Sequence, residues 1–171
     1  MASAPARCGM ENFRKVQTCE EEEGGAPPPF PGLPAGVAEM KVKEGSKIRN
    51  LLAFAAARME AGGARQIVFS GCGRAVTKTV TCVEILKRRL GGGLHQVTEV
   101  RYRRLREVWQ REGRAERLTV PRSVPAICIL LSKDPLEPGQ PGYQAPQPRP
   151  AAGPAPPSRQ GARKKRRLQE S

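Results

Sequence analysis

The segment from Ser70 to Leu90, which reads SGCGRAVTKTVTCVEILKRRL, constrains the fold of this chain more than any other stretch. An apolar run at residues 67–69 is typical of a buried strand, Gly71 and Gly73 follow it, and a helical pattern then begins. Backbone N–H groups at a glycine-flanked helix start attract phosphate oxygens, and nearby basic side chains strengthen that attraction. Two interpretations stand: a phosphate-facing turn made by Ser70, Gly71 and Gly73, or an ordinary strand-to-helix turn beside a solvated charged face.

The charge of the chain favours the first interpretation. The sequence has 30 Lys and Arg residues against 16 Asp and Glu residues, a net charge of +14 and a pI near 10.4. Such an excess indicates a polyanionic partner, either nucleic acid or an acidic membrane surface. No apolar run approaches the roughly 20 residues that cross a bilayer. Glu20–Glu23 and a proline cluster argue against a signal peptide, so we expect a soluble intracellular protein.

The charges and prolines divide the chain into three regions. Residues 1–38 carry 3 basic and 5 acidic residues with six of the 17 prolines, and residues 134–171 carry 7 basic and 3 acidic residues with nine prolines. Residues 39–133 carry 20 basic and 8 acidic residues but only two prolines. Apolar residues are too sparse in the end regions to offset the entropy of ordering. We therefore predict disordered segments over 1–37 and 134–171, and one compact nucleic-acid-binding domain over 38–133.

The hydrophobic pattern of the compact region predicts alternating strands and helices. A short strand is expected at residues 39–43, and Ser46 is a candidate N-cap for a helix over residues 47–59. The run at residues 65–70 is continuously apolar, as expected for a strand with both faces covered. A second helix is expected over residues 74–90.

Two further strands follow, at residues 95–106 and 124–131. The order is β-α-β-α-β-β, which predicts an α+β sandwich with two helices on one face of a mixed four-stranded sheet. The intervening residues 106–122 are too polar to bury and too long for a tight turn, so they predict an extended hairpin or an ordered loop. This segment either grips a nucleic-acid backbone or is simply solvated. Trp109 either stacks on a base or caps the sheet edge, and we favour the cap.

One apolar residue of the second expected helix departs from its hydrophobic stripe. The stripe that should face the sheet consists of Val76, Val80, Val83, Leu86 and Leu90. Ile85 falls nearly opposite this stripe, among basic residues. It is either a single exposed apolar side chain or, with Leu90, part of a contact with a second subunit.

The cysteines and the single histidine give no sign of a metal site. The five cysteines are scattered, no C-x-x-C pair occurs, and His95 is the only histidine. We interpret Cys82 and Cys128 as small core residues. The chain also has no carboxylate cluster to bind catalytic magnesium or to carry out general acid–base chemistry. We therefore predict no cofactor, no metal and no catalytic residue.

Two phrases of the compact region resemble the Alba family of small dimeric DNA- and RNA-binding proteins. These phrases are EGSKIRNLLAFAAARM and GCGRAVTKTVTCVEILKRRL, and the resemblance covers roughly residues 38–133. Three other phrases resemble a narrower branch, the twenty-five-kilodalton Alba-type subunits of ribonuclease P and ribonuclease MRP: MENFRKV, EVWQ and LSKDPLEPGQPGYQ. MENFRKV begins at Met10, which leaves open whether Met1 or Met10 is the main start.

The resemblance implies an RNA-binding surface. It places Lys47 and Arg49 where the family meets nucleic acid at the start of the first helix, and Arg74 and Lys78 at the basic positions of the second helix. It implies that the hairpin arginines reach along the backbone: Arg101, Arg103, Arg104 and Arg106. Archaeal members often carry two adjacent lysines before the first helix. This chain has Gly45-Ser46-Lys47 there, and this departure leaves the contact set open.

The resemblance also implies a role and partners. The protein would be a non-catalytic subunit that forms a heterodimer with a smaller Alba-type protein and binds a stem-loop arm of the catalytic RNA, alongside other holoenzyme proteins. It would support 5′-leader removal from precursor tRNA and the processing of precursor rRNA, with the preference between ribonuclease P and MRP open. The alternatives are a free-standing Alba protein on chromatin or messenger RNA, a nuclease, and a protein-pairing scaffold.

Both ends of the chain carry a run of charge. The run near the C-terminal end is basic and consists of Arg163, Lys164, Lys165, Arg166 and Arg167. Such a run is typical of a nuclear-localisation signal or of an RNA-gripping tail, and it predicts a nuclear, specifically nucleolar, protein. Glu20–Glu23 is an acidic run near the other end. Whether this acidic run shields the basic surface is open at this point.

Overall fold

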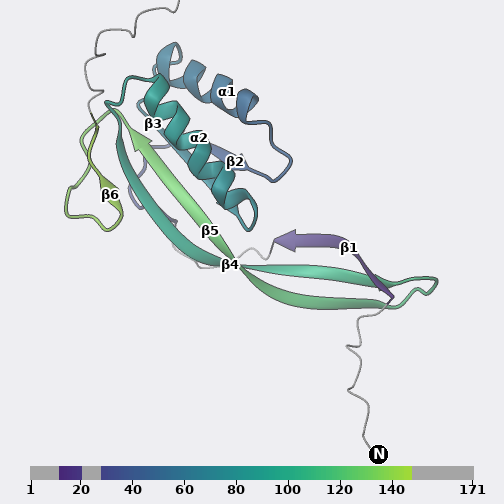
Figure 1. The fold of residues 1–171 in the computed structure, drawn as a ribbon. Coiled ribbons are helices and arrows are strands. Elements are labelled where there is room, and N and C mark those ends of the chain that lie inside the picture. Colours follow the sequence, from purple (N-terminus) through teal and green to yellow (C-terminus); the bar gives the residue numbers. More distant parts are fainter. Residues whose placement is uncertain (1–11, 21–27, 148–171) are drawn as a thin grey trace, which may run out of the picture.

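A curved, mixed sheet with two helices on one face forms the body of the protein (Figure 1). The computed structural model describes residues 12–20 and 28–147. The predicted order β-α-β-α-β-β is confirmed as β2-α1-β3-α2-β4-β5, with one further strand before it and one after it. The elements are β1 (Phe13–Glu20), β2 (Ala38–Val42), α1 (Ile48–Glu60), β3 (Gln66–Cys72), α2 (Ala75–Arg89), β4 (His95–Arg111), β5 (Arg117–Ser132) and β6 (Tyr143–Gln144).

The sheet is wider than the four strands predicted. Its order is β1-β4-β5-β3-β2, and β6 pairs with β4. β2 and β3 are parallel because α1 connects them as a crossover, whereas the other neighbouring pairs are antiparallel. The α+β prediction is confirmed, and β1 and β6 are the additions that the hydrophobic pattern did not predict.

The terminal regions depart from the predicted disorder where the structure describes them. Residues 13–20 form β1, which pairs with β4 from Leu105 to Arg111. Residues 28–37, which we call the strap, pack on the sheet with Phe30 only 4% exposed. Beyond residue 133, β6 pairs with Gln96 and Val97. The disorder predicted for residues 1–11, 21–27 and 148–171 lies outside the described residues.

One face of the sheet packs against the two helices. Phe69, Ile129 and Leu131 are at most 1% exposed there, as are Met59 of α1 and Leu86 of α2. The buried stripe of α2 differs from the predicted one, because it consists of Ala75, Thr79, Cys82, Val83 and Leu86. Val80 was predicted to face the sheet, but it is 40% exposed. Ile85, predicted on the opposite side, is partly buried against this core.

The back face of the sheet has its own small core. Val68, Val97 and Leu130 alternate with the helix-side residues along their strands, and the strap covers them with Phe30. Leu136 and Tyr143 pack against the same cluster from the C-terminal side. Both faces of β3 and β5 are therefore covered, as their continuous apolar sequences predicted. Cys128 lies in this back core and Cys82 in the helix-side core, which confirms both as core residues.

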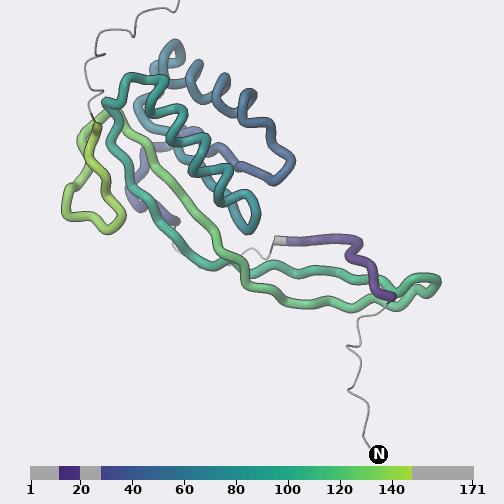
Figure 2. The backbone as a smooth tube through the Cα atoms, in the orientation of Figure 1, coloured from purple at the N-terminus to yellow at the C-terminus, as the bar shows by residue number. Residues whose placement is uncertain are grey.

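The segment after residue 106 is an extended hairpin, as predicted. β4 and β5 pair continuously from His95–Ser132 to Gln110–Arg117, and their distal ends project past the helices as an arm (Figures 1 and 2). β1 lies along the arm. Trp109 stands in register between Lys15 of β1 and Leu118 of β5, which places its strand inside the sheet and not at its edge.

Polar contacts hold β1 to the arm. The Glu107 side chain is 7% exposed, and its Oε1 lies 3.3 Å from Lys15 Nζ of β1 and 3.3 Å from Arg122 Nη1 of β5. Burial tends to raise the pKa of Glu107, but the two cations outweigh it and hold that pKa below its ordinary value. The carboxylate is therefore a charged link between three strands.

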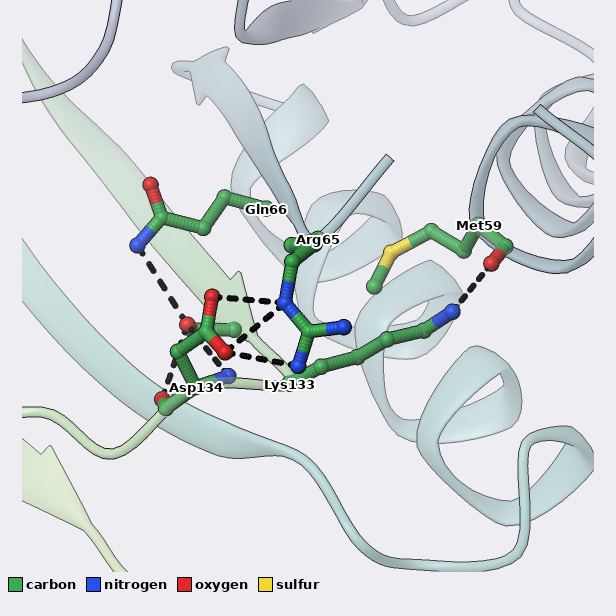
Figure 3. Close-up of polar contacts among 6 residues, drawn as sticks. Met59, Arg65, Gln66, Lys133 and Asp134 are labelled. Atoms are coloured by element: carbon green, nitrogen blue, oxygen red, sulfur yellow. Dashed lines mark hydrogen bonds and ion pairs between the residues drawn. The ribbon is translucent and has the colours of Figure 1, made fainter. Parts of the chain in front are cut away.

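The end of α1 is tied to the end of β5 (Figure 3). The Asp134 carboxylate accepts hydrogen bonds from Arg65 Nε at 2.7 and 2.8 Å, and Arg65 Nη2 lies 2.6 Å from Asp134 Oδ1. The Lys133 ammonium donates to the Met59 carbonyl oxygen in the last turn of α1. We call this group the α1–β5 clasp. It satisfies a carbonyl that the helix end leaves without an intrahelical donor.

Candidate nucleic-acid interface

The loop between β2 and α1, residues 43–47, is fixed to the first turns of α2. Lys78 Nζ donates to the carbonyl oxygen of Glu44 and to that of Ser46, the latter at 3.0 Å. Arg74 Nη1 lies 3.3 Å from Glu44 Oε1, and both side chains are largely exposed. Lys78 therefore has a structural task in addition to its predicted one. Its ammonium joins the starts of the two helices.

Ser46 is not the N-cap that the sequence predicted. Lys47 occupies the N-cap position of α1 and makes no side-chain capping hydrogen bond. Ser46 Oγ instead accepts a hydrogen bond from the Lys43 N–H at 3.0 Å, and the Ser46 N–H donates to the Lys43 carbonyl oxygen at 3.0 Å. Ser46 and Lys43 are thus joined by two hydrogen bonds, immediately before Lys47 at the start of α1.

The two glycines before α2 serve different needs. A Cβ at Gly71 would lie 2.1 Å from Thr79 Oγ1, so glycine there lets α2 approach β3 closely. Gly73 has φ +57°, which glycine adopts at no steric cost. The Gly73 N–H donates to the Pro125 carbonyl oxygen at 2.8 Å, and Ser70 Oγ donates to Glu39 Oε1 at 2.7 Å. The Gly73 N–H and the Ser70 hydroxyl of the predicted phosphate-facing turn thus have hydrogen-bond partners within the protein. The phosphate-binding role of this turn stays a prediction.

The basic residues predicted at the two helix starts do gather at one end of the helix layer. Lys47, Arg49 and Arg74 are exposed, and Lys78 is half-buried because it reaches back to the β2–α1 loop. We call Lys47, Arg49, Arg74 and Lys78 the helix-start cluster. Its cations stand beside the N-terminal end of α2, where the helix dipole adds positive potential. Such an arrangement attracts phosphate oxygens.

The hairpin arginines do not form one set. Strand alternation places Arg101 and Arg103 on the back face, where they are half-buried, and Arg104 and Arg106 on the helix side, where they are exposed. Arg101 Nη2 pairs with Glu99 Oε1. The sequence pattern R-Y-R-R-L-R contained this alternation, but the prediction treated the four arginines as a single surface.

Two basic residues at the end of β2, Lys41 within the strand and Lys43 just after it, were missed by the sequence prediction. Lys41 and Lys43 are exposed and alternate with Met40 and Val42, which are buried in the helix-side core. Lys41 therefore lies on the back face, on the same side as Arg103, and Lys43 follows in the loop. The alternation that predicted the strand was the signal that would have found them.

An apolar surface lies beside α2 on the helix side of the sheet. Val100 and Tyr102 of β4 are 71% and 73% exposed, and Val100 pairs with Ile127 of the helix-side core. Lys87 Nζ of α2 donates to Gln96 Oε1 of β4 at 2.9 Å, so this face of α2 is turned toward β4. Val80 lies seven residues before Lys87 and therefore on the same face of the helix, next to β4. We call Val80, Val100 and Tyr102 the α2–β4 patch.

Ile85 and Leu90, the residues predicted to contact a second subunit, are not part of this patch. Ile85 and Leu90 are partly buried against the protein's own core. The α2–β4 patch presents more exposed apolar area than these two residues, and contiguous exposed apolar area is the usual mark of an interaction site. The contact predicted at Ile85 and Leu90 stays a prediction.

Among the described residues, the thiols and the metal-ligand types form no further site. Burial raises the pKa of both Cys82 and Cys128, so these thiols stay protonated and unreactive at neutral pH. Within residues 12–20 and 28–147, no group of three or more His, Cys, Asp or Glu side chains is placed to hold a metal ion. No helix in this part of the chain is long and apolar enough to cross a membrane.

The charged runs near the two ends of the chain fall mostly beyond what the structure describes. Residues 21–23 of the acidic run lie outside the described residues. So does the whole of the predicted nuclear-localisation run, which consists of Arg163, Lys164, Lys165, Arg166 and Arg167. The nuclear role of these five residues therefore stays a prediction from the sequence.

Comparison with known proteins decides the family. The Alba family model matches residues 38–104. Human "Ribonuclease P protein subunit p25" is 57% identical over 166 residues, which cover 86% of this chain and 82% of that protein. The chain belongs to the Alba family. Human "Ribonuclease P protein subunit p25-like protein" is 46% identical over 165 residues, covering 95% of this chain and 99% of that protein.

A solved structure from the Alba family is also similar to part of this chain. Alba from Thermoplasma volcanium aligns with 55% of this chain and 98% of its own length, at 19% sequence identity and a TM-score of 0.40. The match of the Alba family model begins at the first residue of β2 and ends in β4. β1, the strap, β5 and β6 lie outside that match, whereas the two human relatives align over most of the chain.

Proposed function

We propose that this chain is a non-catalytic, RNA-binding protein subunit of ribonuclease P and ribonuclease MRP. The observation that carries the proposal is the 57% identity over 86% of the chain to a protein named as a ribonuclease P subunit. The helix-start cluster supports it, because four basic residues at one end of the helix layer suit an RNA backbone. In this role the chain supports 5′-leader removal from precursor tRNA and the processing of precursor rRNA.

The binding depends mainly on phosphate contacts. Each phosphate neutralised by a lysine or arginine releases a condensed counterion, so affinity falls steeply as the salt concentration rises. Double-stranded RNA has a deep, narrow major groove that side chains do not read. The helix-start cluster and the β4–β5 hairpin therefore recognise a stem-loop of the catalytic RNA by its shape and its backbone.

The partner is a smaller Alba-type subunit, with which this chain forms a heterodimer through the α2–β4 patch. Val80, Val100 and Tyr102 are exposed apolar residues next to each other on the helix side, and burying them against an apolar partner surface is favourable. Tyr102→Glu should abolish co-elution of the two subunits, whereas Tyr143→Phe, which changes a tyrosine on the back face, should leave it intact. Unchanged co-elution of Tyr102→Glu would exclude the patch.

RNA binding is tested by charge reversal within the helix-start cluster and, as a control, at the far end of α2. Arg74→Glu and Lys47→Glu should weaken binding of the stem-loop arm in a gel shift with the partner present. Arg89→Glu makes the same change of charge 15 residues further along, about 22 Å from Arg74, and should bind almost as the wild type does. Equal losses for Arg74→Glu and Arg89→Glu would show that net charge matters and that the helix-start cluster does not.

The ribonucleoprotein assignment is tested by purification of the tagged chain. The catalytic RNA and precursor-tRNA cleavage activity should co-purify with it. Recovery of bulk messenger RNA or chromatin without that RNA would instead support a free-standing Alba protein. A heterodimer that forms normally but has no RNA affinity would support a protein-pairing scaffold.

We place the protein in the nucleus, within the nucleolus. The basic run Arg163–Arg167 supports this location, because runs of this kind are recognised for nuclear import. A fluorescent fusion of the full chain should concentrate in nucleoli, and replacing the five basic residues with alanine should release it to the cytoplasm. Unchanged nucleolar signal after that replacement would assign the run to another task.

A further inference from the structure

A cleft of about 370 Å³ opens where β2 and β3 end, between those strand ends and β1. Its walls come from Lys41 and Lys43 of β2 and the adjoining loop, from Arg103 of β4 and from Thr18 of β1. β1 lies outside the match of the Alba family model, which covers residues 38–104. One wall of the cleft therefore comes from a strand outside the region that the family model matches.

Several of the residues that line the cleft are small. Gly71 and Cys72 of β3 lie opposite Ile127 and Ala126 of β5 in the sheet register, and Cys128 follows. A Cβ at Gly71 would lie 2.1 Å from Thr79 Oγ1 of α2, so a larger residue there destabilises the packing. Because α2 packs closely on β3 at this point, the residue that lines the cleft there is a glycine. The result is a mainly apolar hollow at the lower end of the size range of ligand pockets.

The rim of the cleft carries positive charge. Lys41 and Lys43 are exposed residues of the lining, and Arg103 is a half-buried one. The acidic residue in the lining, Glu44, directs its carboxylate to Arg74 at 3.3 Å. A cationic rim over an apolar floor fits a ligand with an anionic backbone and a flat, apolar face.

The cleft is also continuous with the helix-start cluster. Glu44 lines the cleft, and through Arg74 and Lys78 the same residue is bound to the first turns of α2. The helix-start cluster and the cleft are therefore adjacent, and one strand of RNA is able to contact both.

We propose that this cleft receives one unpaired nucleotide of the bound RNA, with its base on the small-residue floor and its phosphates at Lys41 and Lys43. A base inside an A-form duplex is stacked and paired, so only a base from a loop, bulge or end is able to enter. Arg103 supplies a planar group on which such a base stacks. This inference rests on the proposed RNA-binding function and adds a preference for RNA with an unpaired base.

The experiment compares two RNAs on the full chain with its partner: a stem-loop with a single bulged uridine, and the same stem with that uridine paired. The wild type should bind the bulged RNA about tenfold more tightly, the usual effect of stacking one base on protein. Cys72→Phe fills the floor and should bind both RNAs with the affinity of the wild type for the paired stem. Cys72→Ser, the matched control, should keep the tenfold preference.

A second measurement needs no substitution. Alkylation of Cys72, followed by mass spectrometry, should slow when the bulged RNA binds but not when the paired RNA binds. Cys19 of β1 is also a partly exposed thiol. It is the internal reference and should respond equally to both RNAs. If Cys72→Phe loses affinity for the paired stem as well, the fold has been disturbed. Thr18→Trp, an exposed change at the mouth of the cleft, then provides the test in its place.

The outcomes separate this proposal from the one it rests on. Failure of the wild type to bind either RNA would overturn the RNA-binding function itself. Equal binding of the two RNAs, or a preference that survives Cys72→Phe and Thr18→Trp, would overturn the nucleotide cleft and leave RNA binding in place. Protection of Cys72 by the partner subunit without RNA would assign the cleft to a protein contact and overturn the proposal.

Discussion

The two faces of the central sheet are covered by different means. The helix face packs against α1 and α2, which both lie in the region shared with the Alba family, and it contains most of the fully buried large side chains. The back face packs against the strap and the segment that leads to β6, both from outside the region matched by the family model. The comparison teaches that the helix face is covered by elements of the region that the Alba family model matches, whereas the back face is covered by segments outside that match.

The first way to break this comparison is to remove one phenylalanine from each face. Phe69 is 0% exposed under the helices and Phe30 is 4% exposed under the strap. Phe69→Ala should lower the free energy of unfolding by about 4 kcal/mol, because it leaves a cavity in the main core. Phe30→Ala should cost roughly 2 kcal/mol, because the strap is able to detach without unfolding the sheet. Urea denaturation measures both.

Proteolysis supplies the control for that pair. Phe30→Ala should expose the strap to protease while the domain from β2 to β5 stays resistant, and Phe69→Ala should make the whole domain sensitive. If both variants lose the same stability and become sensitive everywhere, the two faces form one cooperative unit, and the comparison fails.

The second prediction concerns the close approach of α2 to the sheet. Gly71→Ala should destabilise the protein by about 2 kcal/mol, because its new Cβ would lie 2.1 Å from Thr79 Oγ1 and 3.1 Å from the Ala75 carbonyl oxygen. Gly93→Ala is the matched control, since a Cβ there meets nothing within 4 Å. A Gly71→Ala variant as stable as Gly93→Ala would show that the helix gives way at little cost. Thermal unfolding in a calorimeter decides between them.

The third prediction sharpens the comparison at the arm, where β1 is held by charge and not by an apolar core. The pKa of Glu107 is lower in the folded protein than in the unfolded chain, because Lys15 and Arg122 outweigh the effect of burial. Its stabilising effect is therefore complete above the unfolded pKa, about 4.3, and is lost as the pH falls through the folded pKa. Glu107→Gln should cost about 1 kcal/mol at neutral pH, less than a fully buried charged hydrogen bond, because Lys15 and Arg122 are about half exposed to solvent.

Its measurement is the difference in urea midpoint between the wild type and Glu107→Gln as a function of pH. The difference should shrink below about pH 4, because the wild-type carboxyl then becomes neutral as well. The other carboxyl groups are common to both proteins and cancel. A difference that is constant down to acid pH would mean that the Glu107 charge does not hold β1.

The smallest expected effect is at the α1–β5 clasp. Asp134→Asn removes the carboxylate that pairs with Arg65, but both side chains face solvent and exposed ion pairs contribute little. The denaturation midpoint should fall slightly at low salt and return toward the wild-type value at high salt, because salt screens the pair. Glu137→Gln removes an equal charge three residues away and should have no effect. A large, salt-independent loss would place the clasp in the core of the fold.

The order of elements was predictable because it depends on local periodicity. Helix expectations at residues 47–59 and 74–90 became Ile48–Glu60 and Ala75–Arg89. The buried face of α2 was not predictable in the same way. The helix packs closely over Gly71, so small residues such as Ala75, Thr79 and Cys82 are buried there and the larger Val80 is displaced outward. Periodicity weighs hydrophobic residues and does not register a steric need for small ones.

The candidate site was predictable in part. Lys47, Arg49, Arg74 and Lys78 were named because the resemblance to the Alba family places them at the helix starts. The structure brings the starts of the two helices together, and the role of these residues in RNA binding stays a prediction. Two features that depend on contacts distant in sequence were missed. These are the division of the hairpin arginines between the two faces, and the joining of Lys78 to the β2–α1 loop.

By itself, the sequence determined the element order, the two-faced burial of β3 and β5, and the basic character of the helix starts. All three follow from the spacing of apolar and charged residues within single elements. Only the tertiary structure decided what covers the back face and where the cleft lies. Phe30 sits in a proline-rich segment, and Thr18 lies on a strand paired with residues almost 90 positions away. Such contacts are set by the register and curvature of the sheet, which no local pattern encodes.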